Sequence, residues 1–593
     1  MRKTLCLLIA LPLAISAQTP QTPGPTVRAA LGIQASPSVK VVTRMVTLEV
    51  VVKDSKGRHV SGLKPEDFRL FEQTPNKSKE KREQRIATFR EVSVADLPRE
   101  AGPATSPAAG VYTNAMTPQK DPVPPTIILM DGLNTEVQYQ VQVHAQSVKM
   151  LAQLPSDVPV AVFLLGFRLE MVQDFTSDPK LLQAAVKKAI STAGHDFAQA
   201  DPRDATSLQA SGNSVVTGPT FGETTSVKFK GAQPDLTGPW QDLFRQLDGF
   251  ETFVYRGQMD TRVRLTADAL EAIAQHMSGY PGRKNLLWIS TAFPICIDPA
   301  MDVAQEHVYN RRAEVVANAL SNAKIAVYPI NPAGVRSPTV STYNASSFAP
   351  VVTRAQLVYA MDRQAEGESR ELDTMHLMAD DTGGEVCTGD NDIADCVRRT
   401  VDDSSRYYEI AYYPDSKNWN GEYRRIVLNA KEKGWHLEYR RGYFANADEK
   451  RSEPDAREAL RHAACEGPLD ATSILLTAKR MPPDTPDALK FHLDIGTSAL
   501  TFTPLENGGS EVNLQLGVCT SDKAGKRGQF MSIPLNRKLS AGDVQKVTKS
   551  GIEDIAAIPG PKPASLRLAV MDVPSGRIGS LRIQVDDVSG SAP

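Results

Sequence analysis

An acid closes a short apolar run at residues 128–136, ILMDGLNTE. Asp131 follows three large apolar residues, and Asn134 and Thr135 come three and four positions later. Their carboxylate, amide and hydroxyl oxygens are the ligand types that Mg²⁺ and Ca²⁺ prefer in proteins. The same side chains can instead bond the backbone of the turn that follows and cap the next helix. The residue types therefore leave two interpretations open, a hard-cation site or a structural turn.

Other catalytic signatures are missing from the sequence. The nine histidines are scattered without HxH or HExxH spacing, and no GxSxG, P-loop or GxGxxG stretch occurs. Zinc hydrolysis, serine hydrolysis and phosphate-loop chemistry are therefore disfavoured. No CxxC pair is present, which argues against a zinc ribbon or a redox centre. Cys387 and Cys396 could form a disulfide around a small loop or remain as buried thiols.

Length and charge limit the class of protein. The 593 residues predict about three to five domains. Hydrophobic residues make up 41% of the chain and the mean hydropathy is −0.29, which indicates a folded, water-soluble protein. Lys and Arg number 67 against 69 Asp and Glu, a net charge of −2 that gives no reason to expect nucleic acid as a partner.

The N-terminus predicts export. Residues 1–17 have two basic residues, a short apolar stretch and small residues at the end, as in a cleaved signal peptide. Residues 18–37, rich in Pro, Thr and Ala, are expected to form a flexible leader. No later run is long and apolar enough to span a bilayer, so we expect no transmembrane segment and a periplasmic, cell-surface or extracellular location.

The elements that must position Asp131 lie in residues 125–446. Short apolar runs such as TIILMD and NLLWIS alternate with helical patterns. This alternation predicts an α/β fold with an open, doubly wound, mostly parallel sheet. Residues 193–260 and 332–366 are rich in turn-forming residues and are interpreted as surface insertions near the carboxyl edge of the sheet.

β structure is expected on both sides of this unit. Residues 38–95 show strand alternation and a hairpin turn, which predict an N-terminal β module, and residues 96–124 form a Pro- and Ala-rich linker. Of three β-like segments near the end of the α/β unit, the first, YYEIAYYPD, is a candidate edge strand of the main sheet. A connector at 447–467 leads to residues 468–590, whose short apolar runs predict an antiparallel β-sandwich.

Several phrases resemble a bacterial family of secreted proteins with a von Willebrand factor type A-related domain. In order, they are VVKDSKGRHVSGLKPEDFRLFE, ILMDGLNTE, RKNLLWIS, KIAVYPINPAG, ADDTGGEVC, YYEIAYYP and RRGYF, over about residues 40–446. The resemblance implies a type A-like sheet of six strands with flanking helices, and a binding or assembly role in place of catalysis.

The resemblance also bears on the metal motif. Metal-binding type A domains carry Asp-x-Ser-x-Ser, followed by a separate Thr and a late Thr-Asp-Gly. Asp131 and Thr135 match the first motif, but Leu133 stands at its first Ser and only the neighbouring Asn134 offers an oxygen. The distal positions correspond to Thr192 and to Ser290 and Thr291, so the second acid is missing. We expect no required cofactor and at most a weakly bound divalent cation, Mg²⁺ or Ca²⁺.

The leading hypothesis is a secreted, non-catalytic protein-interaction or adhesion-type module whose partner is another protein. Its basis is the signal sequence, the resemblance and the lack of a catalytic set. One alternative is a hydrolase that acts on envelope polymers through an unrecognised carboxylate pair. Another is a purely architectural envelope protein.

Overall fold

The computed structural model describes residues 45–73, 81–93, 110–115, 124–135, 158–196, 260–293, 303–332, 374–387, 393–445 and 453–585, with short gaps and a few residues of 143–151. They belong to one compact unit, Met45–Pro593. The predicted signal and leader, most of the linker and nearly all of both predicted insertions lie outside the described residues. No described helix is long and apolar enough to cross a membrane.

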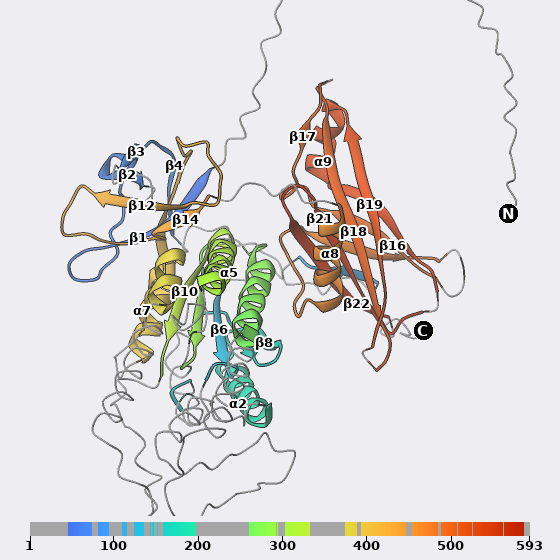
Figure 1. Ribbon diagram of the computed structural model, residues 1–593, viewed down its shortest axis with the longest axis horizontal. Helices are drawn as coiled ribbons and strands as arrows, with labels where there is room; N and C mark the ends of the chain where they lie inside the picture. Colours follow the sequence, from blue (N-terminus) through green and yellow to red (C-terminus); the bar gives the residue numbers. More distant parts are fainter. Residues whose placement is uncertain are drawn as a thin grey trace, which may run out of the picture. The chain divides into compact units, whose positions relative to one another are not determined.

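A five-stranded sheet carries Asp131 (Figure 1). Its order is β10-β9-β6-β7-β8, with four parallel strands and β8 antiparallel to β7. The strands are β6 Thr126–Asp131, β7 Val160–Leu165, β8 Leu169–Thr176, β9 Lys284–Ile289 and β10 Ile325–Ile330. Every residue of the parallel strands is buried, as their continuous apolar runs require. The resemblance implied six strands; the described residues form five, and Cys387 adds one parallel bridge to Ile330.

Helices cover both faces of this sheet. Alternate residues of β6 enter two different cores, with Ile127 and Leu129 on one face and Ile128 and Met130 on the other. Helix 260–277, α5 and helix 374–382 pack in the first core, and α2 and α7 in the second. The named helices are α2 Pro179–Asp196, α5 Val303–Asn322 and α7 Ile393–Ser405.

The strands that follow α7 pair with the N-terminal strands. One sheet has the order β13-β1-β11-β4 and the other β14-β12-β2-β3. Their bounds are β1 Val46–Lys53, η1 Pro65–Asp67, β2 Phe68–Gln73, β3 Arg82–Gln84, β4 Ile86–Ser93, β11 Arg406–Tyr412, β12 Tyr423–Ala430, β13 His436–Glu438 and β14 Gly442–Phe444. Residues 46–93 and 406–444 therefore share two sheets and one core.

This pairing corrects the expectation that the segment YYEIAYYPD joins the main sheet. β11 pairs antiparallel with β1 and β4 instead. Tyr408, Ile410 and Tyr412 face the core shared by residues 46–93 and 406–444, while Glu409 on the other face pairs with Arg90 and Lys324. A strand of the parallel sheet would instead be apolar on both faces.

The C-terminal region is an antiparallel β-sandwich. Its sheets have the orders β20-β16-β15-β5 and β17-β18-β21-β22, with β19 also paired to β18. The bounds are β15 Leu476–Met481, β16 Leu489–Ile495, β17 Thr503–Pro504, β18 Ser510–Ser521, β19 Arg527–Leu539, β20 Ile552–Ile558, β21 Ser565–Asp572 and β22 Arg577–Gln584, with helices α8 Glu453–Arg461, η5 His462–Glu466 and α9 Ala541–Ser550. β5, Val111–Thr113, comes from the predicted linker and pairs with β15, so that segment contributes a strand.

Two disulfides join the described cysteines. Cys387, which forms a bridge to Ile330 of β10, is bonded to Cys396 of α7. Cys465 is bonded to Cys519, which ties η5 to β18. The second pair was not anticipated, because 54 residues separate its members and no short motif marks them.

Candidate functional site

Asp131 ends β6 at the carboxyl edge of the parallel sheet, with only 2% of its surface exposed. Its Oδ1 accepts a bond from the backbone N of Asn134 at 2.9 Å. Its Oδ2 accepts bonds from Asn134 Nδ2 at 2.8 Å and from Trp288 Nε1 at 2.9 Å. The Ser290 side chain also hydrogen-bonds this carboxylate. Four donors therefore converge on a single buried acid.

The same residues fix the turn after β6. Thr135 Oγ1 donates to the backbone carbonyl of Asp131 at 2.5 Å. Asn134 Nδ2 also donates to Thr266 Oγ1 at 2.9 Å, which connects the turn to helix 260–277. Leu133 donates its backbone N–H to Leu165 O and buries its side chain in the core. An apolar Leu133 thus packs where a cation motif needs an oxygen.

Burial raises the pKa of Asp131 from 3.8 to about 6. Loss of hydration destabilises the charged carboxylate, while the bonds from Asn134, Trp288 and Ser290 favour the charge and limit the shift. The acid is therefore ionised at neutral pH, and its charge is stabilised by protein N–H and O–H groups in place of water.

The predicted ligand residues do not fit a divalent cation in this arrangement. Ser290 and Thr291 are buried at the end of β9, and Ser290 is already bonded to Asp131. Thr192 lies in α2, and its side chain is outside the described residues. Among Asp131, Asn134 and Thr135, only Asn134 Oδ1 is a buried side-chain oxygen without a hydrogen bond. One neutral oxygen is a poor substitute for the oxygen shell that Mg²⁺ or Ca²⁺ requires.

Trp288 and Thr266 complete the site and were not predicted from the sequence. Trp288 lies on β9 two residues before Ser290, and its side chain is fully buried. The available signal was general: a buried indole N–H needs a hydrogen-bond acceptor. Which acceptor it finds depends on the pairing of β9 with β6, which brings Trp288 opposite Leu129.

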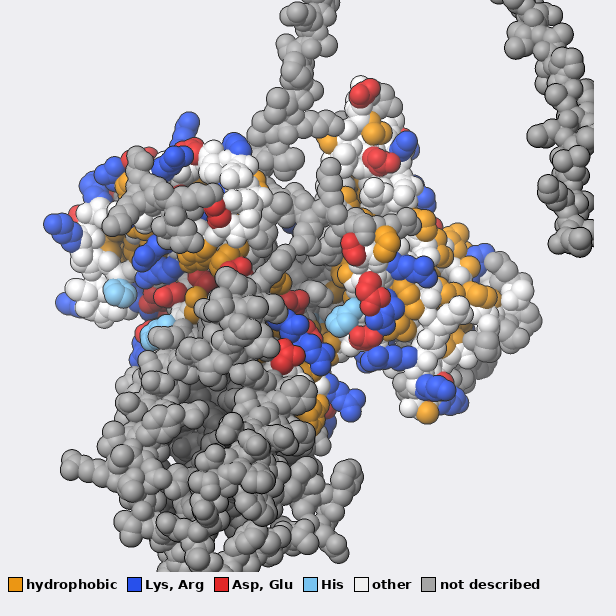
Figure 2. Space-filling view, viewed as in Figure 1, with side chains coloured by type: hydrophobic (Ala, Val, Ile, Leu, Met, Phe, Trp, Pro, Cys, Tyr) orange, Lys and Arg blue, Asp and Glu red, His pale blue; other side chains and the backbone are white. Residues whose placement is uncertain are grey.

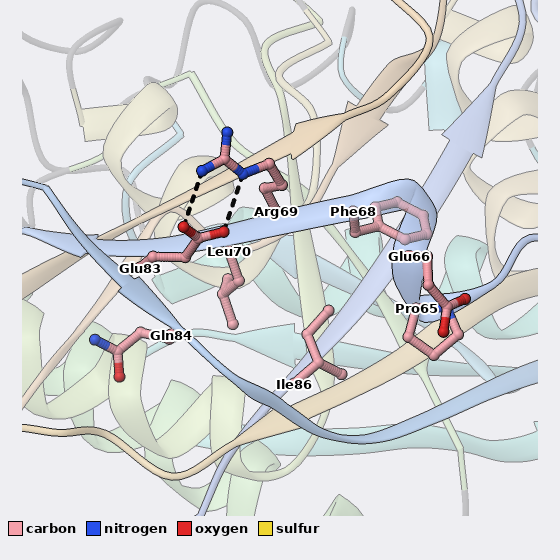
Figure 3. Close-up of a pocket in the computed structure, with 8 residues that line it drawn as sticks. All are labelled: Pro65, Glu66, Phe68, Arg69, Leu70, Glu83, Gln84 and Ile86. Atoms are coloured by element: carbon pink, nitrogen blue, oxygen red, sulfur yellow. Dashed lines mark hydrogen bonds and ion pairs between the residues drawn. The ribbon is translucent and has the colours of Figure 1, made fainter.

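A shallow depression of about 190 Å³ lies on the N-terminal sandwich (Figure 3). Phe68, Leu70 and Ile86 contribute its apolar wall. Arg69 and Glu83, also on its wall, pair with each other through two bonds of 2.9 and 2.8 Å. The lining contains no histidine, cysteine or hydroxyl nucleophile, and it shares no residue with the Asp131 turn, so we assign it no chemistry.

Comparisons with known proteins identify similar structures. No protein-family model and no curated protein matches the sequence. An aerotolerance-related membrane protein from Bacteroides fragilis is 11% identical, with 47% of this chain and 98% of that chain covered and a TM-score of 0.22. The vWF domain of the type V pili tip protein Mfa5 from Porphyromonas gingivalis is 10% identical, with 47% and 95% covered and a TM-score of 0.18.

A third similar structure is the von Willebrand factor type A protein from Catenulispora acidiphila. It is 10% identical, with 64% of this chain and 80% of that chain covered and a TM-score of 0.23. Identities and TM-scores this low say nothing about individual residues or about activity. The chain is similar to solved structures of bacterial proteins with a von Willebrand factor type A domain.

Proposed function

We propose that this protein is an exported, non-catalytic protein-interaction module of the adhesion type. In this proposal a doubly wound α/β domain, flanked by two β modules, presents the binding surface, and the Asp131 turn is a structural support that needs no cation. The observation that carries the proposal is the engagement of the Asp131 carboxylate by Asn134, Trp288 and Ser290.

This engagement argues against catalysis at the best acid candidate. A general acid or base must reach the proton of a substrate directly or through one water molecule. Asp131 is 2% exposed, and both of its oxygens already accept bonds from the protein. A substrate would have to displace Trp288 or Asn134 before the carboxylate could act.

The surface charge supports a protein as partner in preference to a polyanion. Figure 2 shows basic and acidic side chains intermixed over the described parts of one face. A nucleic-acid partner would call for a concentrated basic area. A protein surface of ordinary polarity needs no such excess.

The predicted insertions are our candidates for the recognition surface. Insertion 332–366 follows β10, which runs parallel to β6 and so ends at the same edge as Asp131. Insertion 193–260 leads into helix 260–277, whose Thr266 bonds Asn134 at that edge.

The test is affinity capture with the mature full-length chain, followed by chemical cross-linking in exported protein fractions. We expect one enriched protein, lost when either insertion is replaced by a short Gly-Ser linker. A matched control replaces the exposed turn 54–58, which should leave capture unchanged. Repeated absence of any cross-linked partner would contradict the proposal. So would turnover of an envelope polymer by the wild type that Asp131→Asn abolishes.

A further inference from the structure

Three carboxylates meet at the amino edge of the parallel sheet, opposite the edge that holds Asp131. Glu385 follows helix 374–382, Asp403 lies on α7 and Glu438 on β13. One oxygen from each lies within 4.8 Å of the other two. The three residues come from different segments, so tertiary structure brings them together. We call them the amino-edge cluster.

Asp403 is the most deeply buried member of the amino-edge cluster. It is 1% exposed, and its Oδ2 accepts no hydrogen bond from the described residues. Its Oδ1 forms an ion pair with Lys53 Nζ at 2.5 Å. Glu438 Oε1 bonds the same ammonium at 2.8 Å, while its Oε2 accepts no bond from the described residues. Most buried carboxylate oxygens in proteins have a partner, so Asp403 Oδ2 and Glu438 Oε2 call for one.

The neighbouring cations do not bond every carboxylate of the amino-edge cluster. Lys53 bonds two of its three carboxylates. Arg283 is buried and acts on Asp403 and Glu438 through its charge, but its guanidinium bonds Tyr328 and Gly383. Among the described residues, Lys53 therefore bonds only two of the three carboxylates, and the Arg283 guanidinium is directed at Tyr328 and Gly383. An uncompensated charge beside a buried carboxylate is costly, and a bound cation relieves that cost.

We propose that Glu385, Asp403 and Glu438 form a weak Ca²⁺ site. All three offer oxygen ligands, and the cluster contains no histidine or cysteine that would favour zinc. Ca²⁺ binds oxygens at about 2.3–2.6 Å in irregular shells, so opposite ligands lie about 5 Å apart. Oxygens within 4.8 Å of one another fit that span. Mg²⁺ demands a tighter octahedron at about 2.0–2.1 Å.

Access and competition set the expected affinity. Glu385 is exposed, so an ion can reach the cluster from solvent and complete its shell with water. Lys53 competes for Asp403, because its ammonium occupies the space beside Oδ1. Together these features place the dissociation constant at about 10⁻⁴ to 10⁻³ M, the range of extracellular calcium modules.

Calorimetric titration of the full-length chain with CaCl₂ in calcium-free buffer tests the site. We expect saturable binding by the wild type, and a loss of at least about tenfold in affinity for Glu385→Gln, since each 1.4 kcal/mol of lost ligand energy is tenfold. Because Glu385 is exposed, this variant should fold normally. Asp402→Asn is the matched control, because Asp402 is a neighbouring exposed carboxylate. It should bind like the wild type.

Two further variants keep the outcome clear. Lys53→Met should raise the Ca²⁺ affinity, because it removes the competing ammonium. Asp131→Asn should bind Ca²⁺ like the wild type, which separates this site from the proposed function. Four results would each overturn the proposal: no heat and no rise in unfolding temperature with CaCl₂, unchanged binding by Glu385→Gln, MgCl₂ binding as tightly as CaCl₂, or loss of binding in Asp131→Asn.

Discussion

The two edges of the parallel sheet stabilise buried carboxylates in different ways. At the carboxyl edge, Asp131 is surrounded by neutral donors from Asn134, Trp288 and Ser290. At the amino edge, Asp403 is equally buried but lies among other charges, and its Oδ2 accepts no hydrogen bond from the described residues. Both carboxylate oxygens of Asp131, at the edge with the metal-like motif, therefore accept bonds from the protein. At the edge without a motif, Asp403 Oδ2 and Glu438 Oε2 accept no hydrogen bond from the described residues.

The comparison teaches that donors, more than residue type, decide whether an acid can take a cation. N–H and O–H groups that point at a carboxylate replace its lost hydration and leave no lone pair for an ion. A lysine stabilises the same charge but occupies fewer of the oxygens. Motif matching examines the acid alone and misses this distinction.

The largest expected effect is that of Asp131→Ala. The change leaves Trp288 Nε1, Asn134 N and the Ser290 hydroxyl buried without their acceptor. We expect the free energy of unfolding to fall by about 3–5 kcal/mol, the cost of stranding several buried donors. Urea denaturation measures the loss, with Asp402→Ala as an exposed control. Unchanged or increased stability would mean that the acid is strained, as in an open cation site.

The next effect concerns pH at the amino edge. Burial and, to a smaller extent, the charge of Lys324 lower the pKa of Lys284 from 10.5 to about 7. Between these values the unfolded chain binds a proton that the folded chain has released, so stability rises with pH. Relative to Lys284→Met, the wild type should gain about 3 kcal/mol from pH 7 to 9.5, where exposed tyrosines stay neutral. If the free energy of unfolding changed equally with pH in the wild type and in Lys284→Met, Lys284 would be charged in the folded protein.

A smaller effect is expected for Trp288→Phe. Phe retains an aromatic ring beside Phe293 but removes the N–H that donates to Asp131. Stability should fall by about 2 kcal/mol, from one lost bond and the smaller ring. The pKa of Asp131 should rise above its value of about 6, because this bond helps hold it down. Carbon-13 NMR titration of the carboxyl measures the shift, and an unchanged pKa would show that the indole bond is dispensable.

The smallest stability effect is expected for Glu385→Gln in the presence of a chelator. The side chain is exposed, so the free energy of unfolding should stay within about 0.5 kcal/mol of the wild type. Added CaCl₂ should then stabilise the wild type and leave the variant unchanged. A large loss of stability in chelator would show that Glu385 stabilises the fold without calcium, as Asp131 does at the carboxyl edge.

The sequence predicts the local structure at both edges better than it predicts which strands and side chains contact one another. Apolar runs on both faces mark β6, β7, β9 and β10, and the residues of the Asp131 turn follow from their types. The alternation in β11 marks a strand but does not say that β1 is its neighbour. β5 is too short for its pattern to stand out from the linker around it.

The same reason explains why the amino-edge cluster was not predicted. The end of α7 and two strands, β11 and β12, separate Asp403 from Glu438, and Lys53 lies about 350 residues before Asp403. Local patterns carry no information about contacts over such separations. The bond that Trp288 donates to Asp131 and the bond that Thr266 accepts from Asn134 were missed for this reason as well.

The disulfide between Cys387 and Cys396 has a consequence for biogenesis. It fastens the segment that carries Glu385, two residues before Cys387, to the helix that carries Asp403. Thiols stay reduced in the cytosol and oxidise only after export or in comparable compartments. If the chain is exported, as we propose, this disulfide is absent from the newly made chain until the chain leaves the reducing environment. Oxidation would then act as a maturation step, delaying full assembly of the amino-edge cluster until the chain has been delivered.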